Sequence, residues 1–223
     1  PISRSFPLKV PYPAQVALIV IAYFAAARMS LVLAIPPGYA TAVWPPSGIA
    51  LAATLLLGAR IWPAIWIGAA LANLLVESSF LSAVVIASGN TLEALAGAAL
   101  IRRHVGDPAH FERGEDVLKF IVLCGLASAI AASVAVVPLA IGHWVSWQSS
   151  FGHWWTWWQG DLSGMIVVAP LILSWSAPAS NPWPAQKKME AAFFGVLLLG
   201  TAALITADNA SALAPFSLTF VAL

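Results

Sequence analysis

Long apolar runs separated by short polar segments dominate this sequence. They cover 14–34, 40–58, 61–77, 80–103, 119–141, 151–175 and 190–207, and another begins near Ala212 and is still apolar at Leu223. Because about 20 apolar residues cross roughly 30 Å of hydrocarbon as a helix, the pattern predicts an all-α, polytopic transmembrane helix bundle of about eight spans. We expect the last span to be truncated at Leu223.

The composition agrees with a membrane protein. Of the 223 residues 61% are hydrophobic and 9% are charged, and the mean hydropathy is +0.88. Soluble domains carry about 25% charged residues, so this chain has too few to cover a water-facing surface. Cys124 is the single cysteine, which excludes an internal disulfide, and we expect it to pack as a small apolar side chain. No basic cluster indicates a nucleic-acid partner; the lipid bilayer is the expected one.

The basic residues predict the orientation of the chain. Lysine and arginine occur before the first run, between the second and third, between the fourth and fifth, and before the seventh: Arg4, Lys9, Arg60, Arg102, Arg103, Arg113, Lys119, Lys187 and Lys188. The alternate loops, near 35–43, 77–80, 142–150 and 208–211, contain neither. By the positive-inside rule both the N-terminus and the C-terminus are expected in the cytoplasm.

Three ionisable residues, Arg28, Glu93 and Asp161, lie inside predicted spans. An arginine or aspartate at the centre of a membrane helix costs roughly 2.5 to 3.5 kcal/mol, so such residues normally face the bundle interior or a wet cavity. Arg28 is a candidate partner for either Asp161 or Glu93. We therefore predict that these residues belong to a ligand site or to a switch between two packings.

Helical spacing places further polar residues on the same stripes. The stripes are Trp66, Ala70, Asn73 and Glu77; Asn90, Glu93 and Gly97; and Trp154, Trp158, Asp161 and Met165. They predict an interior lined by carboxylates, amides and indoles, which is a candidate ligand cavity in the outer half of the bundle. The alternative is that these groups only join helices, each hydrogen bond contributing about 0.6 kcal/mol.

The segment WPPSG, Trp44 to Gly48, predicts an interruption in the second span. Pro45 and Pro46 remove two backbone donors, and the helix expected after them, 48–58, is about half a bilayer long. Three alternatives follow: a kinked span, a non-helical entry followed by a helix that starts inside the membrane, or a loop at the interface. In the second, free N–H groups after Pro46 would attract anions or carbonyl oxygens.

Eleven tryptophans are many for this length. Most lie where aromatic belts at the two membrane surfaces are expected. Trp157 and Trp158, nearest to Asp161, are the better candidates for a pocket. We find no motif for a catalytic nucleophile, a phosphate loop or a metal-ligand set, so we predict neither catalysis nor a metal site in this segment.

Three blocks together resemble the bacterial membrane sensor domain MASE1. They are AVWPPSGIALAATLLLGARIWPAIWIGAALAN (42–73), GNTLEALAGAALIRR (89–103) and WWQGDLSGMIVVAPLILSW (157–175). The resemblance covers nearly the whole chain and implies one sensor domain over 1–223, of about eight spans, in the bacterial inner membrane. The motif positions carried over are Trp44, Pro45, Pro46, Ser47, Gly48, Asn73, Asn90, Glu93, Gly160, Asp161, Gly164 and Pro170.

The function expected from this resemblance is signal input. Members of the family precede cytoplasmic output domains such as histidine kinases of two-component systems or diguanylate cyclases that make cyclic di-GMP. We expect such a domain after Leu223, a homodimer, and an unknown small-molecule or protein signal; any cofactor is unknown. The alternatives are a secondary transporter or substrate-binding membrane subunit, and an accessory subunit of a larger membrane complex. Internal repeats of spans would favour a transporter, and no second copy of WPPSG occurs.

Overall fold

The computed structural model describes residues 10–32, 43–75, 79–106, 113–141 and 146–176, and a few isolated positions from 186 to 196. The contacts divide the chain into two units, 1–176 and 177–223. Most of the second unit lies outside the described residues, and with it most of the predicted seventh span and all of the eighth. The one-domain interpretation therefore stays a prediction.

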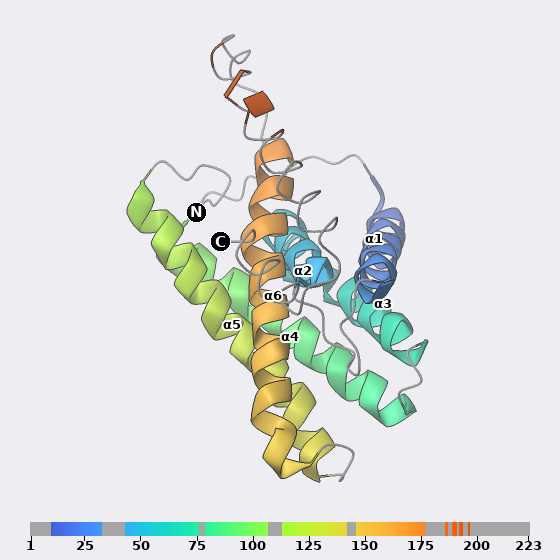
Figure 1. The fold of residues 1–223 in the computed structure, drawn as a ribbon. Coiled ribbons are helices and arrows are strands. Elements are labelled where there is room, and N and C mark those ends of the chain that lie inside the picture. The colour runs from blue at the N-terminus through green and yellow to red at the C-terminus, as the bar shows by residue number, and fades with distance from the viewer. Residues whose placement is uncertain are drawn as a thin grey trace. The chain divides into compact units, whose positions relative to one another are not determined.

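Within the described ranges the first unit is all-α (Figure 1). Its helices are α1 (Tyr12–Val32), α2 (Pro45–Leu57), α3 (Trp62–Leu74), α4 (Phe80–His104), α5 (Gly114–Ile141) and α6 (Trp147–Ser176), with a 3-10 turn, η1 (Ala59–Ile61), between α2 and α3. Three of them are long and apolar enough to cross a membrane: Tyr12–Leu31, Phe80–His104 and Gly114–Val137. The first, fourth and fifth predicted spans therefore coincide with helices of the expected kind.

Two predicted spans are replaced by short helices. Both α2 and α3 contain 13 residues, which corresponds to about 20 Å and is less than the hydrocarbon thickness. The apolar run 40–58 is longer than α2, because Val43, Trp44 and Gly58 are apolar or small but not helical. Positions 40–42, 76 and 77 of the two runs lie outside the described residues. The sixth run lies in α6, whose 30 residues include Pro170 and several polar residues.

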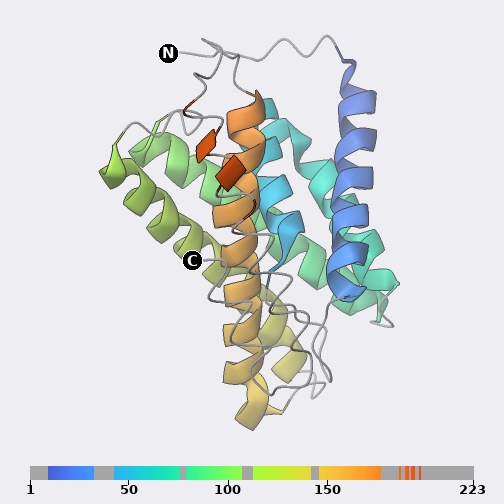
Figure 2. The same cartoon turned by 45° about the horizontal axis from the view of Figure 1, so that its top comes forward.

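Helix α2 lies at the centre of this unit. It packs against α1, α4 and α6, and Figures 1 and 2 both show α6 on one side of it and α1 on the other. Neighbouring pairs complete the bundle: α1 with α3, α3 with α4, α4 with α5, and α5 with α6. One buried cluster gathers apolar residues around Tyr23 and Ile65, and a second gathers them around Leu51 and Met165.

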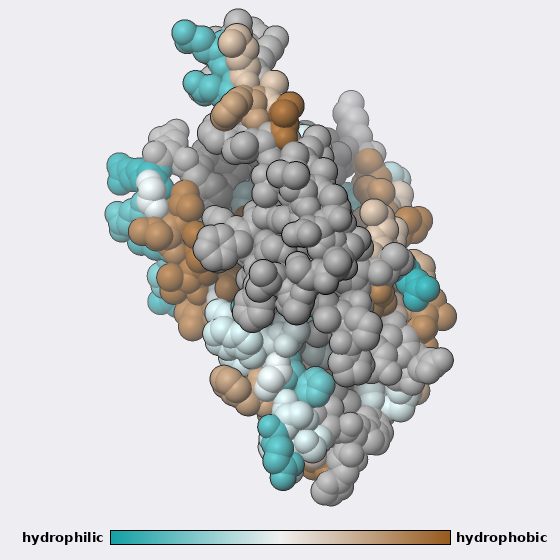
Figure 3. All heavy atoms as spheres, viewed as in Figure 1, coloured by the Kyte–Doolittle hydropathy of each residue, from teal (hydrophilic) through white to brown (hydrophobic). Residues whose placement is uncertain are grey.

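Small residues allow these helices to approach closely. A methyl group at Gly97 would contact Ala127 on α5, and one at Gly68 would contact the ring of Tyr23 on α1. Cys124 packs in the second cluster and is fully buried, which confirms its expected role as a small core side chain. The outward faces are apolar: Figure 3 shows hydrophobic side chains along the visible flanks of the unit, and Leu18, Ile21, Val122 and Leu126 are all more than half exposed. Such faces suit contact with lipid.

Arg60 and Arg102 lie at the same end of the bundle. The ring of Tyr12 at the start of α1 lies under the guanidinium of Arg60, and its hydroxyl donates to the Arg60 carbonyl (2.8 Å). Arg102 near the end of α4 donates to the carbonyls of Thr54 and Leu55 in the last turn of α2 (2.8 and 2.9 Å). The start of α1, the α2–α3 turn and the end of α4 therefore share one end, as the charge pattern requires.

Candidate functional site

A buried cluster of polar side chains joins α2, α4 and α6. The hydroxyl of Ser47 lies 2.6 Å from Asp161 Oδ1 and 3.2 Å from Glu93 Oε2. All three side chains are at most 1% exposed. Glu93 follows Ser47 by 46 positions in the sequence, and Asp161 follows Glu93 by 68. The three distant residues meet at the Ser47 hydroxyl group.

The cluster lies at mid-depth in the bundle. Glu93 stands thirteen residues after the first residue of α4 and eleven before the last, and Asp161 fourteen after the first residue of α6 and fifteen before the last. At 1.5 Å per residue, each carboxyl group is about 16 to 22 Å from the ends of its own helix. Ser47 belongs to the first turn of α2, so α2 begins at this depth and runs from there to the basic end.

The start of α2 is docked directly on α6. The N–H of Trp44 donates to the carbonyl of Gly160 (2.8 Å). A methyl group at Gly164 would overlap the Trp44 carbonyl, and one at Gly48 would overlap the Gly164 carbonyl. Gly160 and Gly164 therefore form a small-residue surface on α6 that accepts the backbone of another segment, which is how glycines spaced by four act in membrane helices.

The structure distinguishes among the three alternatives for WPPSG. Val43 and Trp44 are not helical, the helix begins at Pro45 and includes both prolines, and Pro46, Ser47 and Gly48 are buried. The chain thus enters the bundle without helical structure at these two residues and begins a helix inside it. The helix spans Pro45–Leu57 rather than the expected 48–58, because proline is well suited to the first turn of a helix.

One expectation about this helix start is wrong. We expected free N–H groups that attract anions, but none remains among the first four positions. Trp44 donates to Gly160, Pro45 and Pro46 have no N–H, and the Ser47 N–H donates to the Trp44 carbonyl (3.2 Å). Two carboxyl groups instead face the Ser47 side chain. The chemistry of the site therefore comes from side-chain oxygens.

Asn90 and Tyr23 extend the cluster toward α1. Asn90 is 3% exposed and its Nδ2 donates to the hydroxyl of the fully buried Tyr23 (2.9 Å). Tyr23 lies within electrostatic range of both Asp161 and Glu93. Sequence reasoning missed Tyr23, because a tyrosine in an apolar run looks like an ordinary core residue. The available signal was its hydroxyl, which requires a partner once it is buried.

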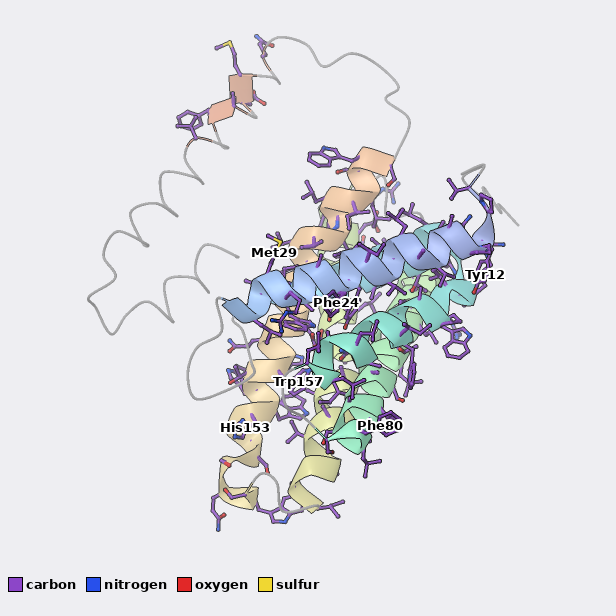
Figure 4. All side chains as sticks on the ribbon, turned by 90° about the vertical axis from the view of Figure 1, so that its right-hand side faces the viewer. Tyr12, Phe24, Met29, Phe80, His153 and Trp157 are labelled. Carbon is purple, nitrogen blue, oxygen red and sulfur yellow. The ribbon has the colours of Figure 1, made fainter. Side chains whose placement is uncertain are left out.

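The two candidate tryptophans play different parts. The indole of Trp157 lies close to the carboxyl group of Asp161, and Figure 4 shows Trp157 on α6 near the middle of the helix. Trp158 donates its Nε1 proton to the carbonyl of Gly125 on α5 (2.8 Å). Its ring also stacks with Trp154, whose Nε1 donates to Ser133 (3.0 Å). Trp158 therefore holds α6 against α5.

Two other predicted residues lie away from the cluster. Arg28 is exposed on α1, and within the described ranges no ion pair joins it to Asp161 or Glu93, so the suggested pairing is not observed. A long arginine side chain on the outer face of a membrane helix can reach the interface instead. Asn73 is half-buried on α3 and donates to the Ala69 carbonyl of its own helix (2.8 Å). Glu77, on the same predicted stripe, lies outside the described residues.

Comparison with known protein families matches residues 15–223 to MASE1. The chain belongs to the MASE1 family. Members are multi-pass, non-catalytic membrane sensor domains, so this chain contacts the lipid bilayer. Comparisons with curated proteins and with solved structures returned no match. The MASE1 match includes all of the described helices except the first residues of α1, and the polar cluster lies inside it.

Proposed function

We propose that this MASE1 chain is the sensory input module of a bacterial signal-transduction protein in the inner membrane. A signal acts on the polar cluster at mid-depth, and the resulting rearrangement passes to a cytoplasmic output domain. The observation that carries this proposal is the single hydroxyl of Ser47 bridging Asp161 and Glu93. Three helices are thereby joined at one point by contacts that small changes can break.

Helix α2 supplies the path between the site and the expected cytoplasmic side. Its first turn holds Ser47, and carbonyls of its last turns accept hydrogen bonds from Arg102. A 13-residue helix is rigid over this length, so a shift at its start displaces its end as well. Two alternative packings of the start of α2 on α6 would provide the bistable element that a sensor needs.

The first test has two steps. Reading the gene beyond the codon for Leu223 shows whether a kinase, cyclase or PAS-type domain follows. Output of the complete protein is then compared between the wild type, Asp161→Asn and the control Asp116→Asn, which replaces an aspartate in the first turn of α5. We expect Asp161→Asn to change basal output and to weaken the response to stimulus, and the control to retain both. Unchanged basal output and response in Asp161→Asn would refute the proposed role of the site.

A secondary transporter is the second candidate. The observation that favours it is the helix start at mid-depth beside two buried carboxyl groups, since transporters place broken helices and ionisable residues near the bilayer midplane. Solute uptake by the purified chain in proteoliposomes would favour this candidate over the sensor. A homodimer is expected for the sensor, and crosslinking in membranes tests that expectation separately.

A further inference from the structure

The polar cluster has more hydrogen-bond acceptors than donors. Within the described residues, Glu93 Oε1, Asp161 Oδ2 and Asn90 Oδ1 are buried and lack a hydrogen-bond partner. The Ser47 hydroxyl has one proton, so it cannot donate to Asp161 and to Glu93 at the same time. The buried amide oxygen of Asn90 is a third acceptor, in addition to the oxygens of the two carboxyl groups. The indole of Trp157 lies close to Asp161, and the Tyr23 hydroxyl keeps a proton of its own, but both groups are neutral. The cluster therefore lacks positive charge.

Neighbouring helices do not supply that charge in the described ranges. Among the described residues, Tyr23 on α1 lies near both carboxyl groups and Cys124 on α5 lies near Glu93, and neither is a cation. Arg102 is engaged by carbonyls of α2, and the Ser128 hydroxyl near Glu93 donates to the Cys124 carbonyl (2.9 Å). Two ionised carboxylates removed from water without a counter-charge would be strongly destabilising.

We propose that Ser47, Asn90, Glu93 and Asp161 form an internal binding site for one monovalent cation. The cation is a proton shared by the two carboxyl groups or a sodium ion held by the oxygen atoms; both bring one positive charge to a set of hard oxygen ligands. Among the residues that the structure describes, no three acidic, histidine or cysteine side chains are placed to hold a metal ion together, so a divalent metal would have few charged ligands. This inference does not depend on the sensory function.

Occupancy of the site would control how α2 is held. With the cation bound, Ser47, Asp161 and Glu93 attract one another through it, and the start of α2 stays docked on Gly160 and Gly164 of α6. With the site empty, two negative charges face each other in a medium of low dielectric constant, and their repulsion favours separation of α4 from α6. Cation binding therefore stabilises the packing observed here.

The test uses the 223-residue chain in lipid nanodiscs and follows thermal unfolding by tryptophan fluorescence. One series lowers the pH without sodium, and another raises sodium chloride at about pH 8, with choline chloride keeping the ionic strength constant. We expect the Tm to rise as the pH falls if the cation is a proton, and to rise with sodium chloride but not with potassium chloride if it is sodium. If the Tm of the wild type responds neither to pH nor to sodium chloride, the proposal is refuted without any variant.

Amide variants separate a cation site from a merely structural cluster. Asp161→Asn and Glu93→Gln remove one negative charge each with little change of shape, so we expect both to lose the cation dependence. At high pH without sodium, both should have a higher Tm than the wild type, because the repulsion is gone. Glu115→Gln, at an exposed position on α5, is the control and should retain the wild-type dependence.

Infrared spectroscopy identifies the cation in the same samples. A proton site predicts a carboxylic-acid C=O band in the wild type at about pH 7, where exposed carboxyl groups are ionised, and its loss in Asp161→Asn or Glu93→Gln. A sodium site predicts either that this band is absent under all conditions or that it disappears when sodium chloride is added at high pH. In both cases the Tm depends on sodium. Cation dependence that is unchanged in both amide variants would overturn the proposal.

Discussion

Ser47 connects the two buried carboxyl groups of the site through one hydroxyl. In Ser47→Ala this donor is lost while both carboxyl groups stay buried, so we expect the free energy of unfolding to fall by about 1 to 3 kcal/mol. Unfolding in mixed detergent micelles measures it. The matched control is Ser174→Ala on α6, where an exposed hydroxyl bonds its own helix, and a change within about 0.5 kcal/mol is expected there. Equal losses in both variants would contradict the bridging role of Ser47.

The site could be predicted from the sequence only where burial has a large energetic cost. Glu93 and Asp161 were recognisable because a carboxyl group inside a membrane span needs an interior position, and the structure buries both. The same reasoning offered Arg28 as a candidate partner, and the structure does not show that pairing, because a long cationic side chain can also lie on the outer face. Tyr23 gave a weaker signal, since most of its surface is apolar. Sequence spacing within one helix also cannot show which residues of different helices meet.

Trp158 holds α6 against α5 through a hydrogen bond from its indole to the Gly125 carbonyl. Trp158→Phe keeps a ring but removes the N–H, so we expect a loss of about 0.5 to 1.5 kcal/mol in the free energy of unfolding. Trp175→Phe is the control, because Trp175 is 82% exposed. If Trp175→Phe destabilised the protein as much as Trp158→Phe, the smaller size of the phenyl ring rather than the loss of this bond would explain the result.

Backbone contact between α2 and α6 depends on Gly164. In Gly164→Ala the new methyl group would overlap the Trp44 carbonyl, so the start of α2 must move away from α6 and the hydrogen bond from Trp44 to Gly160 weakens. We expect a loss of about 1 to 3 kcal/mol in the free energy of unfolding. Gly152→Ala makes the same change on the same helix where no neighbouring atom lies within 4 Å.

The control should be neutral or stabilising by up to about 1 kcal/mol, because alanine favours a helix more than glycine. A stable Gly164→Ala variant that keeps the unfolding free energy of the wild type would show that α2 is not in close contact with α6. The result also bears on function, because the proposed signal path starts at this contact.

At the scale of the whole molecule, the fold class and three spans followed from hydropathy, whereas α2 and α3 did not. A run of apolar residues shows that a segment avoids water, but it does not show where a helix starts within the membrane. Pro45 and Pro46 indicated an interruption, and three interpretations remained until the docking of Trp44 on Gly160 placed the segment. The span count over 177–223 stays a prediction.

The orientation of the molecule is the last prediction. Arg60 contacts Tyr12 and Arg102 contacts the end of α2, so these two basic residues lie at the same end of the bundle. The positive-inside rule assigns that end to the cytoplasm. Because Cys124 is buried, single cysteines elsewhere report their own accessibility. In intact cells we expect a membrane-impermeant maleimide to label Ser149→Cys at the start of α6, and to label His104→Cys at the end of α4 only after the membrane is permeabilised. Labelling in the reverse pattern would place the basic end outside, and α2 would then connect the polar cluster to the periplasmic side, which the proposed route to a cytoplasmic output domain does not allow.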